Sequence, residues 1–207
     1  TRLGGKYIKI SFEKWWQVLV TRQYDGMKGL FVHPVSDLSV IAGNGTIGLE
    51  LLEDLPDMDA VIVPYGGGGL ISGIASAISV LKPGTKIYAS ETSTAAPFFK
   101  SLHAGSPQKI DYVPSFIDGI GSAGILTEMW PRVSSLVNAS IVISPEEIAK
   151  AIKLLMQRSR VIAEGAGGSS VAAALTGKAG YGKIVCVVSG GNIDLEKIVK
   201  IINDQLP

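Results

Sequence analysis

Short apolar runs alternate along this chain with longer segments of helical spacing, which is the pattern of an α/β protein with a mostly parallel sheet. The runs expected as strands are "KYIKI", "GLFVH", "AVIVP", "KIYAS", "SIVIS" and "KIVCVVSGG". Helical spacing is expected at residues 11–22, 38–54, 69–81, 95–103, 145–158, 163–177 and 194–205. The predicted fold class is therefore α/β, an open, mostly parallel twisted sheet with helices on both faces.

Composition excludes several classes of protein. The chain is 46% hydrophobic and only 18% charged, which is enough apolar surface for a sizeable core. Its net charge is +1 with scattered basic residues, so we expect no nucleic-acid partner. No apolar run approaches the ~20 residues that span a bilayer, so we expect no membrane partner. The single cysteine, Cys186, lies in an apolar run and suits a reducing compartment, which predicts a cytoplasmic protein.

The stretch "VPYGGGGLISG" places four consecutive glycines between a predicted strand and a predicted helix. In this position, backbone N–H groups and a helix N-terminus bind an anion, usually a phosphate. The alternative is a tight turn that holds nothing. A P-loop is excluded because no Gly-Lys-Ser/Thr follows. Gly67, Gly69, Ser72 and Glu91 approximate a dinucleotide fingerprint, so an NAD-binding oxidoreductase domain remains a second class.

Two further motifs follow predicted strands. "VVSGGNID" carries a hydroxyl and a carboxamide, and "VIAEGAGG" carries a carboxylate. A parallel sheet gathers its ligand at the carboxyl ends of its strands, so these motifs and the glycine run would face one crevice. One ligand with a phosphate and a flat polar body would satisfy all three.

These motifs, together with "VIAGNGTIGLELL" and "DGIGS", resemble in order and spacing the serine/threonine dehydratase family of pyridoxal-phosphate enzymes, fold type II, which includes serine racemase. The resemblance implies a remnant of a small domain at 1–36 and a large cofactor-binding domain at 37–207. It implies conversion of L-threonine or L-serine to a 2-oxo acid and ammonia, in a homodimer. Serine racemase-like or other amino-acid chemistry is the alternative within the family.

The resemblance also assigns roles to individual residues. The pyridine nitrogen would meet a neutral hydroxyl, which favours loss of the substrate β-hydroxyl over transamination. The phosphate would be held by Gly66, Gly67, Gly68, Gly69 and the Leu70 amide; Ser189 would contact the pyridine nitrogen, Glu164 would lie near the ring edge, and Gly190 and Asn192 would shape the site.

The chain departs from the family at its catalytic lysine. The Ser-x-Lys segment whose lysine forms a Schiff base with the cofactor has no match, and the lysine of "SFEKWW" is a chance likeness. We therefore expect no catalytic residue in this chain. The chain would be a C-terminal portion, inactive alone, whose N-terminal segment is absent or is a separate partner. A non-catalytic remnant is the alternative.

Three other positions bear on the site. Glu91 and Ala95 match two of the three ligand positions at which some family members bind a divalent cation, Mg²⁺ or Ca²⁺, but Pro97 replaces the third, an aspartate. Val35 stands where racemase-like members carry asparagine and dehydratases an apolar or aromatic residue, which favours a dehydratase. His33 and His103 lack partners at metal-ligand spacing and are expected to be structural or surface residues.

Overall fold

Four parallel strands form one sheet within residues 3–207, the part of the chain that the computed structural model describes. The strand order is β3-β2-β1-β4, and each neighbouring pair is parallel. This confirms the predicted α/β class. The strands are β1 (Ala60–Pro64), β2 (Lys86–Thr92), β3 (Ala139–Ile143) and β4 (Ile184–Cys186).

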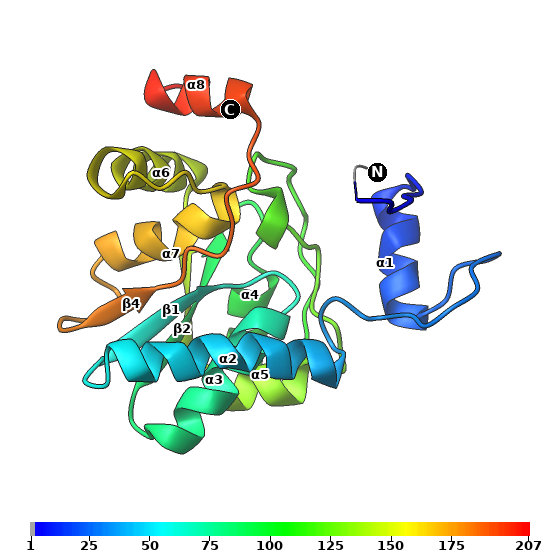
Figure 1. The fold of residues 1–207 in the computed structure, drawn as a ribbon, viewed down its shortest axis with the longest axis horizontal. Helices are drawn as coiled ribbons and strands as arrows, with labels where there is room; N and C mark the ends of the chain where they lie inside the picture. Colours follow the sequence, from blue (N-terminus) through cyan, green and yellow to red (C-terminus); the bar gives the residue numbers. More distant parts are fainter. Residues whose placement is uncertain (1–2) are drawn as a thin grey trace.

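Helices cover both faces of this sheet (Figure 1). Helices α2 and α3 pack on each other along one face, while α6 and α7 pack on the other and α8 lies outside α6. No helix within residues 3–207 combines the length and the hydrophobicity needed to cross a membrane. The helices are α1 (Phe12–Thr21), α2 (Leu38–Asp54), α3 (Gly69–Leu81), α4 (Pro97–Ala104), α5 (Trp130–Leu136), α6 (Pro145–Ser159), α7 (Gly165–Leu175) and α8 (Leu195–Ile202), with a 3₁₀ turn η1 (Asp118–Ile120).

Strand β1 lies at the centre of the core, and all five of its residues are buried. Val61 and Val63 belong to the apolar cluster that includes α3, whereas Ile62 points to the opposite cluster, under α6 and α7. Because both faces are covered, a central parallel strand reads as a continuous apolar run rather than an alternating one.

Local capping fixes the start of α6. The Ser144 hydroxyl accepts the Glu147 N–H at 3.2 Å, and the Glu147 carboxylate accepts the Ser144 N–H at 2.8 Å. This reciprocal pair satisfies two donors that the first turn of a helix leaves unpaired. Pro145 follows at the first helical position, where its missing N–H costs nothing.

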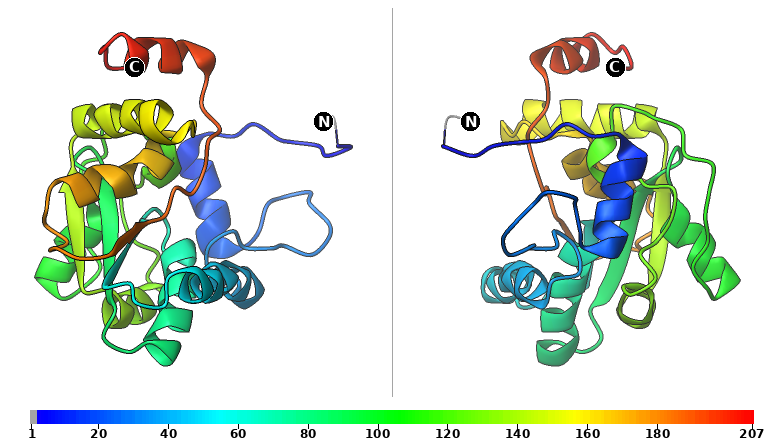
Figure 2. Two further views of the ribbon diagram at one scale, coloured as in Figure 1. Left: turned by 60° about the vertical axis from the view of Figure 1, so that its left-hand side comes forward. Right: turned by 90° about the vertical axis from the view of Figure 1, so that its right-hand side faces the viewer.

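The structure corrects the prediction at three of the expected strands. "KYIKI" and "GLFVH" adopt no regular structure, because neither finds a partner strand within residues 3–207. The run "KIVCVVSGG" is a strand only at Ile184–Cys186, where it pairs with β1 at the sheet edge. Both unpaired runs flank α1, which stands beside the body of the domain (Figures 1 and 2).

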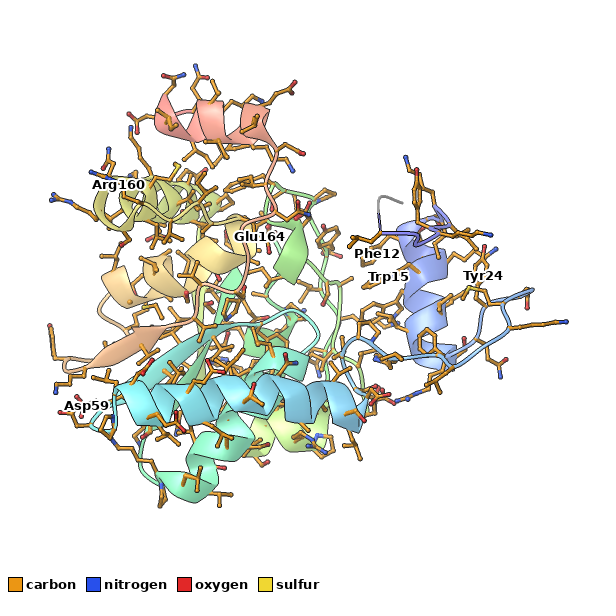
Figure 3. All side chains as sticks on the ribbon, in the orientation of Figure 1. Phe12, Trp15, Tyr24, Asp59, Arg160 and Glu164 are labelled. Atoms are coloured by element: carbon orange, nitrogen blue, oxygen red, sulfur yellow. The ribbon has the colours of Figure 1, made fainter. Side chains whose placement is uncertain are left out.

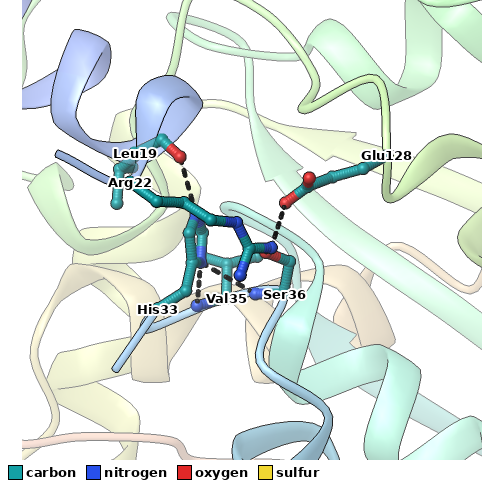
Figure 4. A network of polar contacts seen from close by, with 6 residues as sticks. All are labelled: Leu19, Arg22, His33, Val35, Ser36 and Glu128. Carbon is teal, nitrogen blue, oxygen red and sulfur yellow. Dashed lines mark hydrogen bonds and ion pairs between the residues drawn. The ribbon is translucent and has the colours of Figure 1, made fainter. Parts of the chain in front are cut away.

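His33 joins α1 to the rest of the domain (Figure 4). Its side chain is fully buried, and Nδ1 accepts the N–H groups of Val35 at 3.0 Å and Ser36 at 2.9 Å. The proton therefore resides on Nε2, which donates to the Leu19 carbonyl at 3.1 Å. This confirms the expected structural role of His33. His103 is exposed, as expected of a surface residue, and its Nδ1 lies 2.8 Å from the Phe99 carbonyl.

Candidate functional site

The glycine run links the end of β1 to the first turn of α3. Gly68 is the N-cap of α3 and has a φ of 92°, a left-handed conformation that side chains rarely adopt. The Ser72 N–H donates to the Gly68 carbonyl at 3.0 Å. Within residues 3–207, the backbone N–H groups of Gly66 to Leu70 find no acceptor. Five consecutive N–H groups thus remain available for an anion at a helix N-terminus.

Close packing against neighbouring segments explains why these positions are glycine. A Cβ atom at Gly67 would lie 2.5 Å from Cγ2 of Val35, and one at Gly69 would lie 2.7 Å from the Val35 carbonyl oxygen. A Cβ at Gly66 would lie 3.1 Å from the Gly119 carbonyl oxygen. Val35 therefore lies against the glycine run, and the segment before α2 borders the candidate site.

The three sequence motifs converge on Glu164, which Figure 3 shows at the start of α7. The Glu164 N–H donates to the Gly190 carbonyl at 3.0 Å, and the Glu164 carboxylate lies beside Gly190. The same carboxylate oxygen would lie 3.6 Å from a Cβ at Gly119, the residue that contacts Gly66. The structure thus brings together the segments that follow β1, precede α7 and follow β4.

Burial is the main cause of a raised pKa at Glu164, and the nearby Asp118 carboxylate raises it further. The backbone N–H of Asn192 acts in the opposite direction. Asp118 begins the 3₁₀ turn η1, and its carbonyl accepts the Gly121 N–H at 3.3 Å. The adjacent Gly119 lies near both Gly66 and the Glu164 carboxylate, so Asp118 also borders the candidate site. The sequence signal for this was the Asp-Gly pair in an irregular segment.

Ser189 and Asn192 lie in the exposed segment between β4 and α8. Helix α7 supports this segment from behind, because the Ser170 hydroxyl donates to the Val187 carbonyl at 2.8 Å. A Cβ at Gly167 would lie 2.6 Å from the Gly190 carbonyl oxygen, so α7 approaches the segment closely. The Ser189 hydroxyl has no hydrogen-bond partner in the described residues and is accessible to a ligand.

The Glu91 carboxylate does not fit the cation site that some members of the family have at this position. Glu91 is fully buried, and its oxygens accept the N–H groups of Phe98 at 2.8 Å and Phe99 at 2.7 Å, and the Ser140 hydroxyl at 2.5 Å. Burial nevertheless raises the pKa of Glu91 to about 7. Among residues 3–207, no three His, Cys, Asp or Glu side chains are grouped to hold a metal.

A divalent cation such as Ca²⁺ takes about six to eight oxygen ligands. Glu91 offers one carboxylate, already hydrogen-bonded on both oxygens, and Ala95 can offer only its backbone carbonyl. Pro97 starts α4 where the aspartate would stand. The residues present therefore do not fit a Mg²⁺ or Ca²⁺ ion, and Glu91 instead binds the first turn of α4.

Comparison with known proteins places this geometry in a family. A family model described as "Pyridoxal-phosphate dependent enzyme" matches residues 14–190. The L-threonine ammonia-lyase of Thermotoga maritima is 44% identical over 180 residues, which cover 86% of this chain and 44% of that protein. Human serine racemase is 39% identical over 174 residues, which cover 81% of this chain and 51% of that protein. The chain thus spans about half the length of these curated relatives.

Solved structures agree. Maize serine racemase superposes with a TM-score of 0.75 at 35% identity, over 83% of this chain and 56% of that one. Threonine deaminase from Solanum lycopersicum superposes with a TM-score of 0.77 at 33% identity, over 84% and 49%. The four-stranded parallel sheet with helices on both faces is accordingly the fold type II arrangement that the sequence motifs predicted. The chain belongs to the family of pyridoxal-phosphate-dependent enzymes.

Proposed function

We propose that this chain forms the cofactor-binding part of a pyridoxal-phosphate-dependent ammonia-lyase that acts on L-threonine or L-serine. The observation that carries the proposal is the row of N–H groups from Gly66 to Leu70 without an acceptor at the start of α3. A phosphate dianion there accepts several hydrogen bonds at once and faces the positive end of the helix dipole.

The remaining polar groups suit the ring of the cofactor. Pyridoxal phosphate, when bound, supplies the electron sink for a carbanion at the substrate α-carbon. Ser189 would form one hydrogen bond with the pyridine nitrogen without carrying a charge, while Gly190 and Asn192 would border the ring. Glu164 would lie near the ring edge, and burial raises the pKa of its carboxyl group.

The identity of the side chain at position 35 supports a dehydratase over a racemase. Val35 contacts the glycine run, so its apolar side chain lies at the border of the site and offers no amide to a substrate. A serine racemase-like reaction is the second candidate, because racemases are found among the relatives at nearly the same identity as ammonia-lyases.

The structure offers little support for nicotinamide chemistry. In an NAD-binding domain Glu91 would bind a ribose hydroxyl, but its carboxylate is fully buried and accepts the Phe98 N–H in the first turn of α4. Family membership favours pyridoxal phosphate as well.

An N-terminal segment, in the same or a separate chain, completes the proposed enzyme. We expect it to supply the lysine that bonds the cofactor aldehyde, so that this chain alone binds the cofactor without turnover. The surface that it would cover is strongly apolar, with Leu3 95%, Tyr7 71% and Leu30 92% exposed. Residues 1–36 and 37–207 would then be parts of two domains, in a cytoplasmic homodimer.

The test is a binding and activity assay on the full gene product, including any coding sequence upstream of Thr1. We expect saturable binding of pyridoxal phosphate, much weaker binding of pyridoxal, which lacks the phosphate, and no binding of NAD. With L-threonine or L-serine, release of ammonia and a 2-oxo acid is expected. Equal affinity for pyridoxal and pyridoxal phosphate would contradict the phosphate site, and racemisation without ammonia release would favour the second candidate.

A further inference from the structure

Glu91 caps a helix that does not contain it. Helix α4 begins at Pro97 after Ala96, which has no side-chain cap to offer. The Glu91 carboxylate, at the end of β2, instead accepts the N–H groups of Phe98 and Phe99. A third donor, the Ser140 hydroxyl from β3, holds the same carboxylate. Because the first N–H groups of a helix have no partner within it, this contact fixes where α4 starts relative to the sheet.

Phe98 and Phe99 share this anchor but point in different directions. Phe98 is fully buried, and its ring stacks on Tyr65 with centroids 4.3 Å apart and planes 9° apart. Phe99 is 38% exposed, and its ring lies 4.3 Å from that of His103 on the same helix. Of the two side chains, only Phe98 therefore connects the start of α4 to the buried core.

Tyr65 lies directly under the glycine run that it precedes. Its backbone N–H donates to the Ser90 carbonyl at 2.9 Å, and its ring is 1% exposed. A Cβ at Gly68 would lie 3.3 Å from both Cε2 and the hydroxyl oxygen of Tyr65. That hydroxyl has no hydrogen-bond partner in the described part of the chain. The ring is consequently held by packing, which includes its stack on Phe98, and it contacts Gly68 together with Val133, whose Cγ1 would lie 3.1 Å from a Cβ at Gly68.

We propose that Glu91 is a positioning residue for the phosphate-binding loop, acting through the first turn of α4 and the Phe98–Tyr65 stack. This inference rests on the proposed function of the N–H groups from Gly66 to Leu70. Gly68, with its φ of 92°, lies in the middle of this row of N–H groups, at the N-cap of α3. A displacement of the Tyr65 ring changes the support of Gly68 and therefore the direction of the neighbouring N–H groups.

Phe98→Leu tests the stack, and Phe99→Leu is its matched control on the same helix turn. In the full gene product at pH 8, we expect F98L to weaken binding of pyridoxal phosphate about fivefold, the equivalent of one aromatic pair. Binding of pyridoxal, which lacks the phosphate, is expected to stay unchanged. F99L should match the wild type for both compounds. A variant that is merely less well folded loses affinity for both, so the ratio of the two affinities reports the loop itself.

Substitutions of Glu91 test the anchor. Glu91→Gln keeps one acceptor oxygen for the helix N–H groups, whereas Glu91→Ala keeps none. The ratio of the affinity for pyridoxal phosphate to the affinity for pyridoxal should therefore fall further in E91A than in E91Q. Should E91A fail to fold, Ser140→Ala removes only one donor from the carboxylate and should lower the ratio about twofold. An unchanged ratio in folded F98L and E91Q would overturn the inference. A wild type without preference for the phosphate would instead overturn the proposed function.

Discussion

Nδ1 of His33 accepts the backbone N–H of Val35 at 3.0 Å, and the Val35 side chain in turn lies against Gly67. A buried imidazole thus holds the residue that borders the candidate phosphate loop. The same ring bonds to Leu19 of α1, so one side chain connects the N-terminal segment to the candidate site (Figure 4). Arg22 reinforces the coupling by donating to the Ser36 hydroxyl at 2.8 Å and pairing with Glu128 at 3.2 Å.

Replacement of His33 should therefore affect both stability and the site. His33→Ala leaves the partly buried N–H groups of Val35 and Ser36 and the Leu19 carbonyl without partners, and we expect a loss of about 3 kcal/mol in the free energy of unfolding. Urea denaturation measures this. His103→Ala, at an exposed position, should change it by less than about 0.5 kcal/mol. Similar losses in the two variants would contradict the role given to His33.

The contact between Val35 and the glycine run predicts a specific rescue. Gly67→Ala places a Cβ 2.5 Å from Val35 Cγ2 and should destabilise the protein by about 1–3 kcal/mol and weaken pyridoxal phosphate binding. Val35→Ala removes the clashing methyl groups, so the double variant should recover much of both losses. Gly69→Ala meets the Val35 carbonyl oxygen instead, and V35A should not rescue it. Additive effects of G67A and V35A would show that the side-chain contact is not the cause.

The buried Glu91 predicts a pH dependence of stability. Burial raises its pKa in the folded protein to about 7, well above the usual value near 4.5. Between these two values the folded state binds more protons than the unfolded state, so this group makes stability fall as pH rises from about 4.5 to 7. The neighbouring Tyr65 adds no charge there, because burial and the Glu91 charge raise the pKa of its phenol.

Urea midpoints at pH 5.5 and pH 8 measure this effect. The decrease in midpoint on going to pH 8 should be smaller in Glu91→Gln than in the wild type, because glutamine does not titrate. Glu146→Gln, at an exposed site on α6, provides the control and should keep the wild-type difference. If the urea midpoint of E91Q decreased between pH 5.5 and pH 8 as much as that of the wild type, the pH dependence would belong to other groups.

Local patterns predicted most of the helices, although not α5, and strands β1, β2 and β3 of the sheet. Apolar spacing predicted helix α2 at Leu38–Asp54 and a helix at 145–158, where α6 begins at Pro145. These elements are set by interactions within a few residues, which the sequence displays directly. "KYIKI" was wrongly expected as a strand because a strand also needs a partner, and no pattern within the run shows whether one is present.

The part of the candidate site that lies at the carboxyl ends of the parallel strands was predictable from the sequence. Strand ends of a parallel sheet share one edge, so the glycine run and the "VVSGGN" segment could be expected together. The role of Glu91 could not be predicted. An acidic residue at the end of a strand is typical of a ligand-binding residue, and only the structure shows that its carboxylate accepts the N–H groups at the start of α4. The contact of Val35 with Gly67 joins positions far apart in the chain, and only the folded structure reveals it.

Ser189 offers a test of the ring-binding half of the site that is independent of the phosphate loop. Ser189→Ala removes the hydroxyl proposed to meet the pyridine nitrogen, a loss of about 1 kcal/mol or roughly fivefold in affinity. Because both pyridoxal phosphate and pyridoxal contain the ring, S189A should weaken both compounds equally, whereas G67A should weaken only the phosphate-bearing one. Ser135→Ala, on the exposed side of α5, is the control and should change neither. Fluorescence titrations with the two compounds separate these outcomes, and a loss confined to pyridoxal phosphate in S189A would place Ser189 at the phosphate rather than at the ring.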